Sequence, residues 1–197
     1  MTTHAPRPTP SDLDRALDEV SASSSGGAPF LFAFGLTLGA TGLAAFWLPV
    51  KTAALIALFQ GNVALPLAFL IERRLRLTPM AGDNPLRPLS VQLAMSQIAA
   101  LPAVLLLYYL APWTVPFGLA CMAAAHLVPY AWLQRTRVYL VVSVVLPAGA
   151  GAITLWHWES ALPWTLLWFG AVYWGAVPLL YRRSRALLAS DWRPRAA

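Results

Sequence analysis

The sequence has few charged residues, and this shortage excludes an ordinary soluble domain. Charged residues make up 11% of the 197 residues and hydrophobic residues 58%, whereas soluble domains have about 25% and about 45–50%. The composition therefore predicts a membrane protein. The single cysteine, Cys121, excludes both an intramolecular disulfide and a thiolate metal cage.

Signatures of catalysis are also missing. An intramembrane serine protease needs an activated serine with a base in reach, and no G-x-S-x-G occurs in an apolar run. Aspartyl chemistry needs two carboxylates, and the apolar runs contain none. A metal site needs three or four ligands, of which His157 and Glu159 could supply only two. We therefore predict no catalytic residues, no metal and no cofactor.

The net charge of +6 does not favour a nucleic-acid partner. Nucleic-acid binding needs basic residues gathered on one solvated face. Here the arginines stand in clusters at the ends of apolar runs, as they do in proteins whose partner is the lipid bilayer.

Six apolar runs have the length of about 17–25 residues that a membrane-spanning helix needs. None of them contains Asp, Glu, Lys or Arg. They predict an all-α integral membrane protein, a six-helix bundle built from three helical hairpins. The runs cover residues 30–48, 52–71, 89–110, 113–133, 138–156 and 162–181.

The arginines predict that both termini are cytoplasmic. With that orientation, 13 of the 14 basic residues lie inside and only Lys51 lies outside, as the positive-inside rule requires. The tryptophans independently favour the same orientation, because five of them lie near the predicted outer interface. The inner basic clusters are Arg73, Arg74, Arg76, Arg135, Arg137, Arg182, Arg183 and Arg185.

The predicted spans form one transmembrane domain, residues 29–182, between two cytoplasmic tails. Residues 183–197 form a basic tail. Residues 1–28 contain a short amphipathic acidic helix and the Ser/Gly linker Ser21–Gly27. The acidic helix either docks on inner arginines, of which Arg73, Arg74, Arg76 and Arg182–Arg185 are the candidates, or stays mobile on a flexible linker.

Uncharged polar residues and one histidine interrupt the predicted spans. Polar groups in hydrocarbon need partners, and these residues could share a layer at and below the membrane midplane in spans two to four. The layer is either a set of interhelical hydrogen bonds or a cavity that handles a ligand or protons. Its candidate members are Gln60, Asn62, Gln92, Ser96, Gln97 and His126. For His126 we predict a hydrogen bond from a ring nitrogen to span two or three, with Asn62 or Gln97 as the first candidates.

A small-residue stripe, Gly35, Gly39 and Gly42, has the GxxxG spacing that lets two membrane helices approach closely. We expect its partner to lie within the fold.

Three stretches resemble an uncharacterised bacterial family of small multi-pass membrane proteins. They are LPLAFLIERRLRL (65–77), NPLRPLSVQLAMSQ (84–97) and AHLVPYAWLQRTRVYL (125–140). In the last stretch, His126, Pro129, Tyr130 and Trp132 carry the resemblance. The resemblance implies no activity, but it suggests that the cytoplasmic half of spans two to four is the part of the sequence under constraint.

The sequence thus favours a polytopic bacterial inner-membrane protein that is not an enzyme. It would act as a membrane subunit or partner-binding protein, with another membrane protein as its partner. The alternative is a small transporter-like protein with a polar cavity at the inner half of spans two to four. Neither reading identifies a small-molecule substrate.

The topology is tested by single cysteines in a Cys121-free background. A cysteine at His157 or Glu159 is expected to react with an impermeant thiol reagent added outside the cell. A cysteine at Thr78 is expected to react only after the membrane is opened. The reverse pattern would contradict the orientation, and labelling of both sites from outside would contradict the number of spans.

Overall fold

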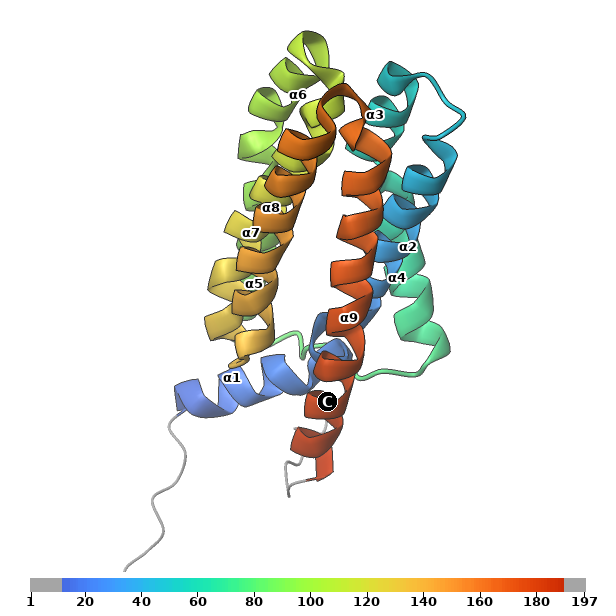
Figure 1. The fold of residues 1–197 in the computed structure, drawn as a ribbon. Coiled ribbons are helices and arrows are strands. Elements are labelled where there is room, and N and C mark those ends of the chain that lie inside the picture. The colour runs from blue at the N-terminus through green and yellow to red at the C-terminus, as the bar shows by residue number, and fades with distance from the viewer. Residues whose placement is uncertain (1–11, 190–197) are drawn as a thin grey trace, which may run out of the picture.

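The computed structural model describes residues 12–189, and all regular structure in that range is helical (Figure 1). The start of the acidic tail, residues 1–11, and the end of the basic tail, residues 190–197, lie outside the described residues. In chain order the elements, with η for a 3-10 turn, are α1 (Asp12–Ala22), η1 (Ser23–Gly27), α2 (Ala28–Ala44), α3 (Val50–Phe59), α4 (Gly61–Arg74), α5 (Arg87–Met95), η2 (Ser96–Ala100), α6 (Leu101–Leu110), η3 (Pro112–Thr114), α7 (Val115–Leu133), α8 (Arg137–His157), η4 (Trp158–Ser160) and α9 (Ala161–Ala189).

Several helical stretches are long and apolar enough to cross a membrane. Within residues 12–189 there are four such stretches, and the bent pair of α3 and α4 makes a fifth. One of the four, Arg137–Ala189, contains both α8 and α9, which lie side by side as a hairpin (Figure 1). Large hydrophobic side chains along these helices are exposed, among them Val141 and Val144 at 58% and 62%. Such extensive apolar surface is that of a multi-pass membrane protein.

The centre of the bundle is the contact between α2 and α9. A Cβ atom added at Gly170 of α9 would lie 2.9 Å from the carbonyl oxygen of Gly35 and 3.2 Å from Cα of Gly39. One at Gly42 would lie 2.9 Å from Cβ of Leu166. The predicted glycine stripe therefore packs within the fold, where two backbones approach as closely as small residues permit.

Two of the predicted spans are interrupted. The run 52–71 is divided at Gln60, where α3 and α4 meet at 44°. The run 89–110 contains the 3-10 turn η2, because Pro102 has no amide hydrogen to donate to the carbonyl of Ile98, which accepts from Leu101 instead. The break at Gln60 therefore changes the direction of the span, whereas Arg87–Leu110 continues as one helical stretch.

The Ser/Gly segment does not form the flexible linker that its composition predicts. Ser24, Ser25, Gly26 and Gly27 all have positive φ, and together they form a left-handed turn. The turn is fixed because the Tyr139 hydroxyl donates a hydrogen bond of 2.6 Å to the carbonyl of Gly26. At Gly27, a Cβ atom would lie 2.4 Å from that hydroxyl oxygen. This turn directs α1 across one end of the bundle (Figure 1).

The basic C-terminal tail also differs from its predicted boundary. Helix α9 continues to Ala189, so Arg183 and Arg185 are helical residues. Ser184, between them, is buried and donates a hydrogen bond of 3.1 Å to the carbonyl of Ala22. This contact holds the end of α9 against α1.

Substitution of the glycine at the α2–α9 contact tests the packing. Gly170→Ala is expected to lower the free energy of unfolding by about 1–3 kcal/mol, because the added methyl group meets backbone that cannot yield. Gly175→Ala is the matched control on the same helix, since its Cβ atom would meet no atom within 4 Å. Unfolding in mixed detergent measures both variants. An equal response of the two would contradict the close approach.

Candidate functional site

His126 joins α7 to α5. Its Nδ1 lies 2.6 Å from the carbonyl oxygen of Leu93, and because a carbonyl only accepts, Nδ1 carries the hydrogen. One turn further along α7, the Tyr130 hydroxyl donates to the carbonyl of Ser90 over 2.8 Å. The predicted hydrogen bond from His126 to span three is confirmed. Its acceptor is a backbone carbonyl rather than the predicted Asn62 or Gln97.

Of the other members of the predicted polar layer, Ser96 lies beside His126, because its hydroxyl donates over 2.7 Å to the same carbonyl of Leu93. Gln60 accepts a hydrogen bond of 2.6 Å from the Thr37 hydroxyl of α2. Asn62, Gln92 and Ser96 are exposed, and Gln97 is half-buried. Spans three and four thus share part of the predicted layer, whereas within residues 12–189 no hydrogen bond joins Gln60 or Asn62 of span two to His126.

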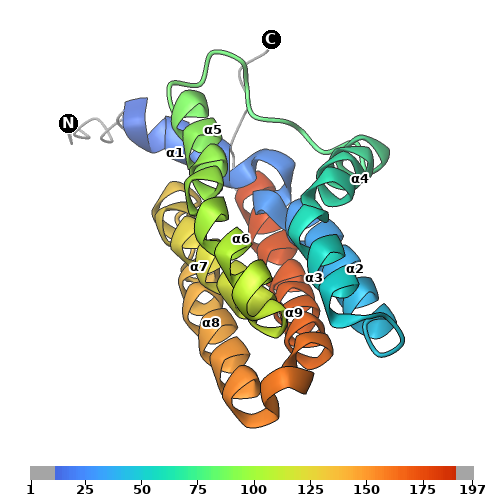
Figure 2. The same cartoon turned by 90° about the horizontal axis from the view of Figure 1, so that it is seen from above.

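The reason is the position of α4. This helix packs mainly against α2, while α5 packs against α7. Figures 1 and 2 show α4 and α5 on opposite borders of an open side of the bundle. From Arg87 to Leu110 only Val104 is buried, and no residue of α5 is buried. We call this region the open side; of the helices beside it, α4 has the exposed residues Asn62 and Val63, and α5 with η2 has the exposed residues Val91, Gln92 and Ser96.

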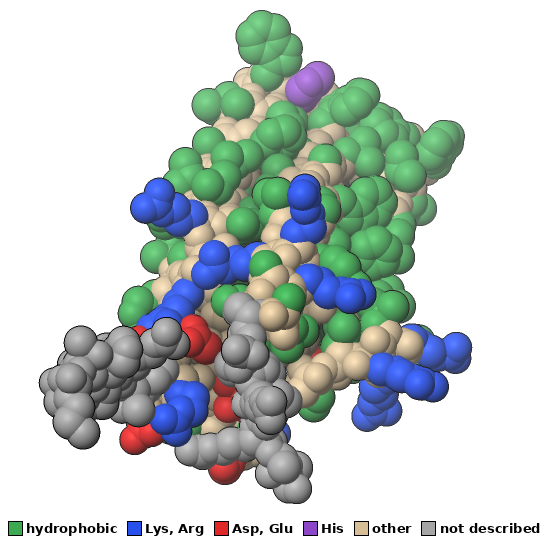
Figure 3. Space-filling model, turned by 90° about the horizontal axis from the view of Figure 1, so that it is seen from below, with side chains coloured by type: hydrophobic (Ala, Val, Ile, Leu, Met, Phe, Trp, Pro, Cys, Tyr) green, Lys and Arg blue, Asp and Glu red, His purple; other side chains and the backbone are tan. Residues whose placement is uncertain are grey.

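The basic clusters lie at the end of the bundle that α1 crosses, and all of their side chains are exposed (Figure 3). Two of the arginines occupy unusual backbone positions. Arg76 and Arg135 have φ of 51° and 47°, because α4 and α7 each end in a Schellman motif. In these motifs the amides of Leu77 and Thr136 donate to the carbonyls of Glu72 and Ala131. Sequence patterns missed both turns, since glycine normally occupies this position.

Helix α1 docks on one end of the bundle through an apolar face. Ala16, Leu17 and Val20 are buried in one cluster with Leu86 and Leu133. Asn84 strengthens this contact, because its side-chain amide donates to the carbonyl of Ala16 over 3.2 Å. The acidic tail helix is thus an ordered part of the fold.

The acidic face of α1 pairs with Arg135. The guanidinium donates to Asp18 over 2.9 Å and also to Asp14. Burial alone would lower the pKa of Arg135, but these two carboxylates raise it above its ordinary value. Helix α1 therefore docks on an arginine, as predicted. That arginine is Arg135 and not one of the predicted candidates, which were Arg73, Arg74, Arg76 and Arg182–Arg185. Glu19 adds a further link by accepting a hydrogen bond of 2.8 Å from the Ala81 amide.

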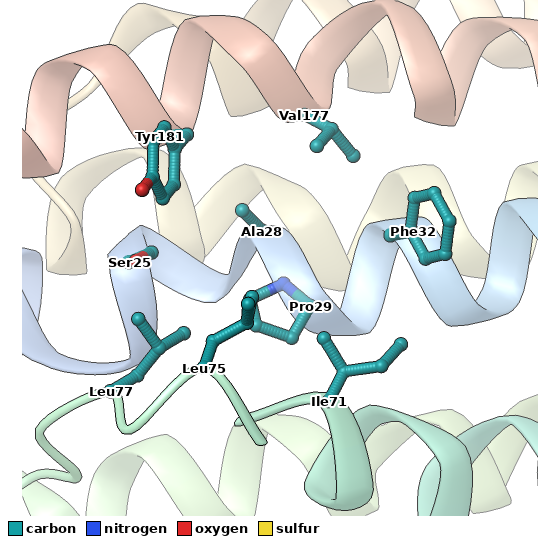
Figure 4. Close-up of a pocket in the computed structure, with 9 residues that line it drawn as sticks. All are labelled: Ser25, Ala28, Pro29, Phe32, Ile71, Leu75, Leu77, Val177 and Tyr181. Carbon is teal, nitrogen blue, oxygen red and sulfur yellow. The ribbon is translucent and has the colours of Figure 1, made fainter. Parts of the chain in front are cut away.

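A groove of about 210 Å³ lies on another side of α4, near the same end of the bundle (Figure 4). Its walls come from α2, α4, α9 and the segment that follows α4. The lining side chains are almost entirely apolar: Ser25, Ala28, Pro29, Phe32, Ile71, Leu75, Leu77, Val177 and Tyr181. No group of three His, Cys, Asp or Glu residues that could hold a metal ion occurs in residues 12–189.

Comparison with known families shows a match over most of the chain. The model of a family of unknown function (DUF7010) matches residues 13–183, in agreement with the resemblance to an uncharacterised family. No curated protein and no solved structure matches the chain. The match spans α1 through most of α9, so the docked N-terminal helix lies within the matched region.

The hydrogen bond of His126 can be tested by removal. His126→Leu is expected to lower the free energy of unfolding by about 0.5–1.5 kcal/mol. The loss stays small because the Ser96 hydroxyl also donates to the Leu93 carbonyl, over 2.7 Å, and leaves it partnered. Gln92→Leu, at an exposed amide of α5, serves as the control and is expected to cost nothing. An unchanged stability of His126→Leu would contradict the contact.

The ion pairs of α1 can be tested by charge reversal. Exposed pairs contribute about 0.2–1 kcal/mol each, so Arg135→Glu is expected to speed hydrogen exchange in α1 by roughly ten-fold. Combining it with Asp14→Arg and Asp18→Arg is expected to restore protection. Arg15→Glu is the control, because Arg15 pairs with Asp12 of its own helix. Equal effects of Arg15→Glu and Arg135→Glu would contradict the assignment.

Proposed function

We propose that this chain, which belongs to the family of unknown function DUF7010, is a non-enzymatic subunit of the bacterial inner membrane. In this proposal it binds another membrane protein through the open side between α4 and α5. The observation that carries the proposal is an exposed side-chain amide near the middle of the predicted run 52–71. That amide belongs to Asn62.

The proposal includes six membrane crossings with both termini in the cytoplasm. The crossings are α2, the bent pair α3 and α4, the pair α5 and α6, and the single helices α7, α8 and α9. Arginine clusters gather at the end where α1 lies, which supports a cytoplasmic position for that end. Tryptophans support the opposite position for the other end: Trp47 and Trp156 are 82% and 87% exposed at its turns, as expected for a membrane interface.

Asn62 supports a protein partner at the open side. It stands near the middle of the predicted run 52–71 and is exposed, and its side-chain amide has no hydrogen-bond partner within residues 12–189. Hydrocarbon offers no partner to an amide, and polar side chains in membranes therefore face protein or water. A helix of another protein with a polar side chain would satisfy Asn62 and cover the exposed apolar residues beside it.

Helix α5 supports the same occupant. Its exposed side chains include the polar Gln92 as well as Val91 and Met95. A mixed surface of this kind suits a protein interface, in which apolar contact area surrounds a few hydrogen bonds. A transporter-like function instead needs the polar groups to line a water-filled path, and this alternative predicts a different result in the experiment below.

Photo-crosslinking in cell membranes tests the proposal. A photoreactive residue at Val63 is expected to crosslink to one discrete protein, and Asn62→Leu is expected to weaken that crosslink about three-fold or more, since membrane hydrogen bonds contribute about 0.6–2 kcal/mol. Val144 on α8 is the matched control, because its exposure of 62% equals that of Val63 at 63%.

The control separates a specific interface from random contact in the membrane. Crosslinking to lipid alone at both positions would contradict the proposal. So would equal protein crosslinking at Val63 and Val144. A cysteine at Asn62 that reacts with a water-soluble thiol reagent, in the absence of any protein crosslink at Val63, would favour the transporter-like alternative.

A further inference from the structure

The groove between α2, α4 and α9 has the character of a site for a lipid chain. Figure 4 shows Ile71 of α4 and Val177 of α9 facing the first turns of α2, where Pro29 and Phe32 line the wall. The groove holds about 210 Å³ and is almost free of polar surface. Within a membrane an apolar groove of this kind excludes water and accommodates hydrocarbon.

The groove ends among arginines. Tyr181 lines it, and the guanidinium carbon of Arg185 lies 5.2 Å from the centre of the Tyr181 ring. Arg185 also donates to the Tyr181 hydroxyl from Nε over 3.1 Å and from Nη2 over 2.8 Å. A guanidinium has five hydrogens to donate, so three remain for another acceptor. Arg185 is thus held at the groove with donors to spare.

A second arginine stands on the α4 side of the groove. Leu75 and Leu77 both line the wall, and Arg76 between them has its side chain exposed. The left-handed backbone of Arg76 turns the chain here, so that both neighbouring leucines face the groove. Ile71 is the residue of α4 that lines the groove. The carboxylate that follows it in the chain, Glu72, accepts a hydrogen bond from the Ser24 hydroxyl.

We propose that this groove binds an anionic phospholipid of the cytoplasmic leaflet. One acyl chain lies between α4 and α9, and the headgroup phosphate accepts hydrogen bonds from Arg185 and Arg76. The inference rests on the membrane placement in the proposed function, although not on the protein partner at the open side. Charge complementarity selects the anionic class, because basic residues at the inner membrane surface attract anionic headgroups.

Native mass spectrometry of the full-length protein in detergent tests the proposal. The probes are phosphatidylglycerol and phosphatidylcholine with the same acyl chains. Phosphatidylglycerol is expected to bind about twenty-five-fold more tightly, because each of the two arginines contributes about five-fold, and replacing either one with glutamine is expected to reduce the preference about five-fold. The double variant Arg76→Gln with Arg185→Gln therefore binds both lipids alike.

Two further variants identify the site. Val177→Trp fills the groove and is expected to weaken both lipids without changing their ratio. Arg137→Gln removes the same charge from α8, away from the groove lining, and is expected to keep the preference. Equal binding of the two lipids by the unmodified protein would overturn the proposal. A preference that survives in the double variant would also overturn it.

The membrane placement has its own readout. Retention of the protein in membranes washed at alkaline pH is expected, and release would contradict the proposed function itself. Retention without a preference for phosphatidylglycerol would contradict only the lipid site.

Discussion

The fold depends on the close approach of α2 and α9. Between apolar helices in a bilayer the hydrophobic effect provides no driving force, so packing and hydrogen bonds must hold the helices together. Gly170 brings the backbone of α9 against Gly35 and Gly39 of α2, and the other contacts extend from this pair. On one side α2 carries α4, and on the other α9 carries α8, which packs in turn on α7. Helix α1 reaches the same pair through Ser184.

Polar contacts are concentrated at the end where α1 lies. There Tyr139 donates a hydrogen bond to the left-handed turn of η1, and Ser184 donates one to the carbonyl of Ala22. The acidic face of α1 forms an ion pair with Arg135. Near the interface these groups are close to water, and unpaired ones cost less than they would in the hydrocarbon. The hydrogen bonds can therefore set the geometry of the helix ends there. At the opposite end the interhelical contacts are aromatic, such as Phe46 with Trp164.

Most of the helices could be predicted from the sequence, whereas their rotations could not. Uninterrupted apolar runs predicted α7, α8 and most of α9, because an apolar run of about 20 residues is typical of a membrane-spanning helix. A helix that is apolar on every side has no periodic signal to show which face is buried. For this reason Asn62 was expected inside and lies exposed, and Gln60 pairs with Thr37 of α2 instead of joining His126. Composition also failed at Ser24–Gly27, where Gly26 and Gly27 accept positive φ readily but Ser24 and Ser25 adopt it although non-glycine residues rarely do.

Helix α4 connects the two proposed binding surfaces. Its main packing partner is α2, and its direction is set by the 44° bend at Gln60. One side of α4 contributes Ile71 to the groove, and Asn62 is exposed at the open side. A lipid chain between α4 and α9 would fill the space that otherwise allows α4 to tilt toward α9. It would thereby fix the distance between α4 and α5 that a partner helix has to match. A lipid that binds one arrangement of α4 better than another shifts the population toward that arrangement, so the two sites would be coupled through the position of a single helix.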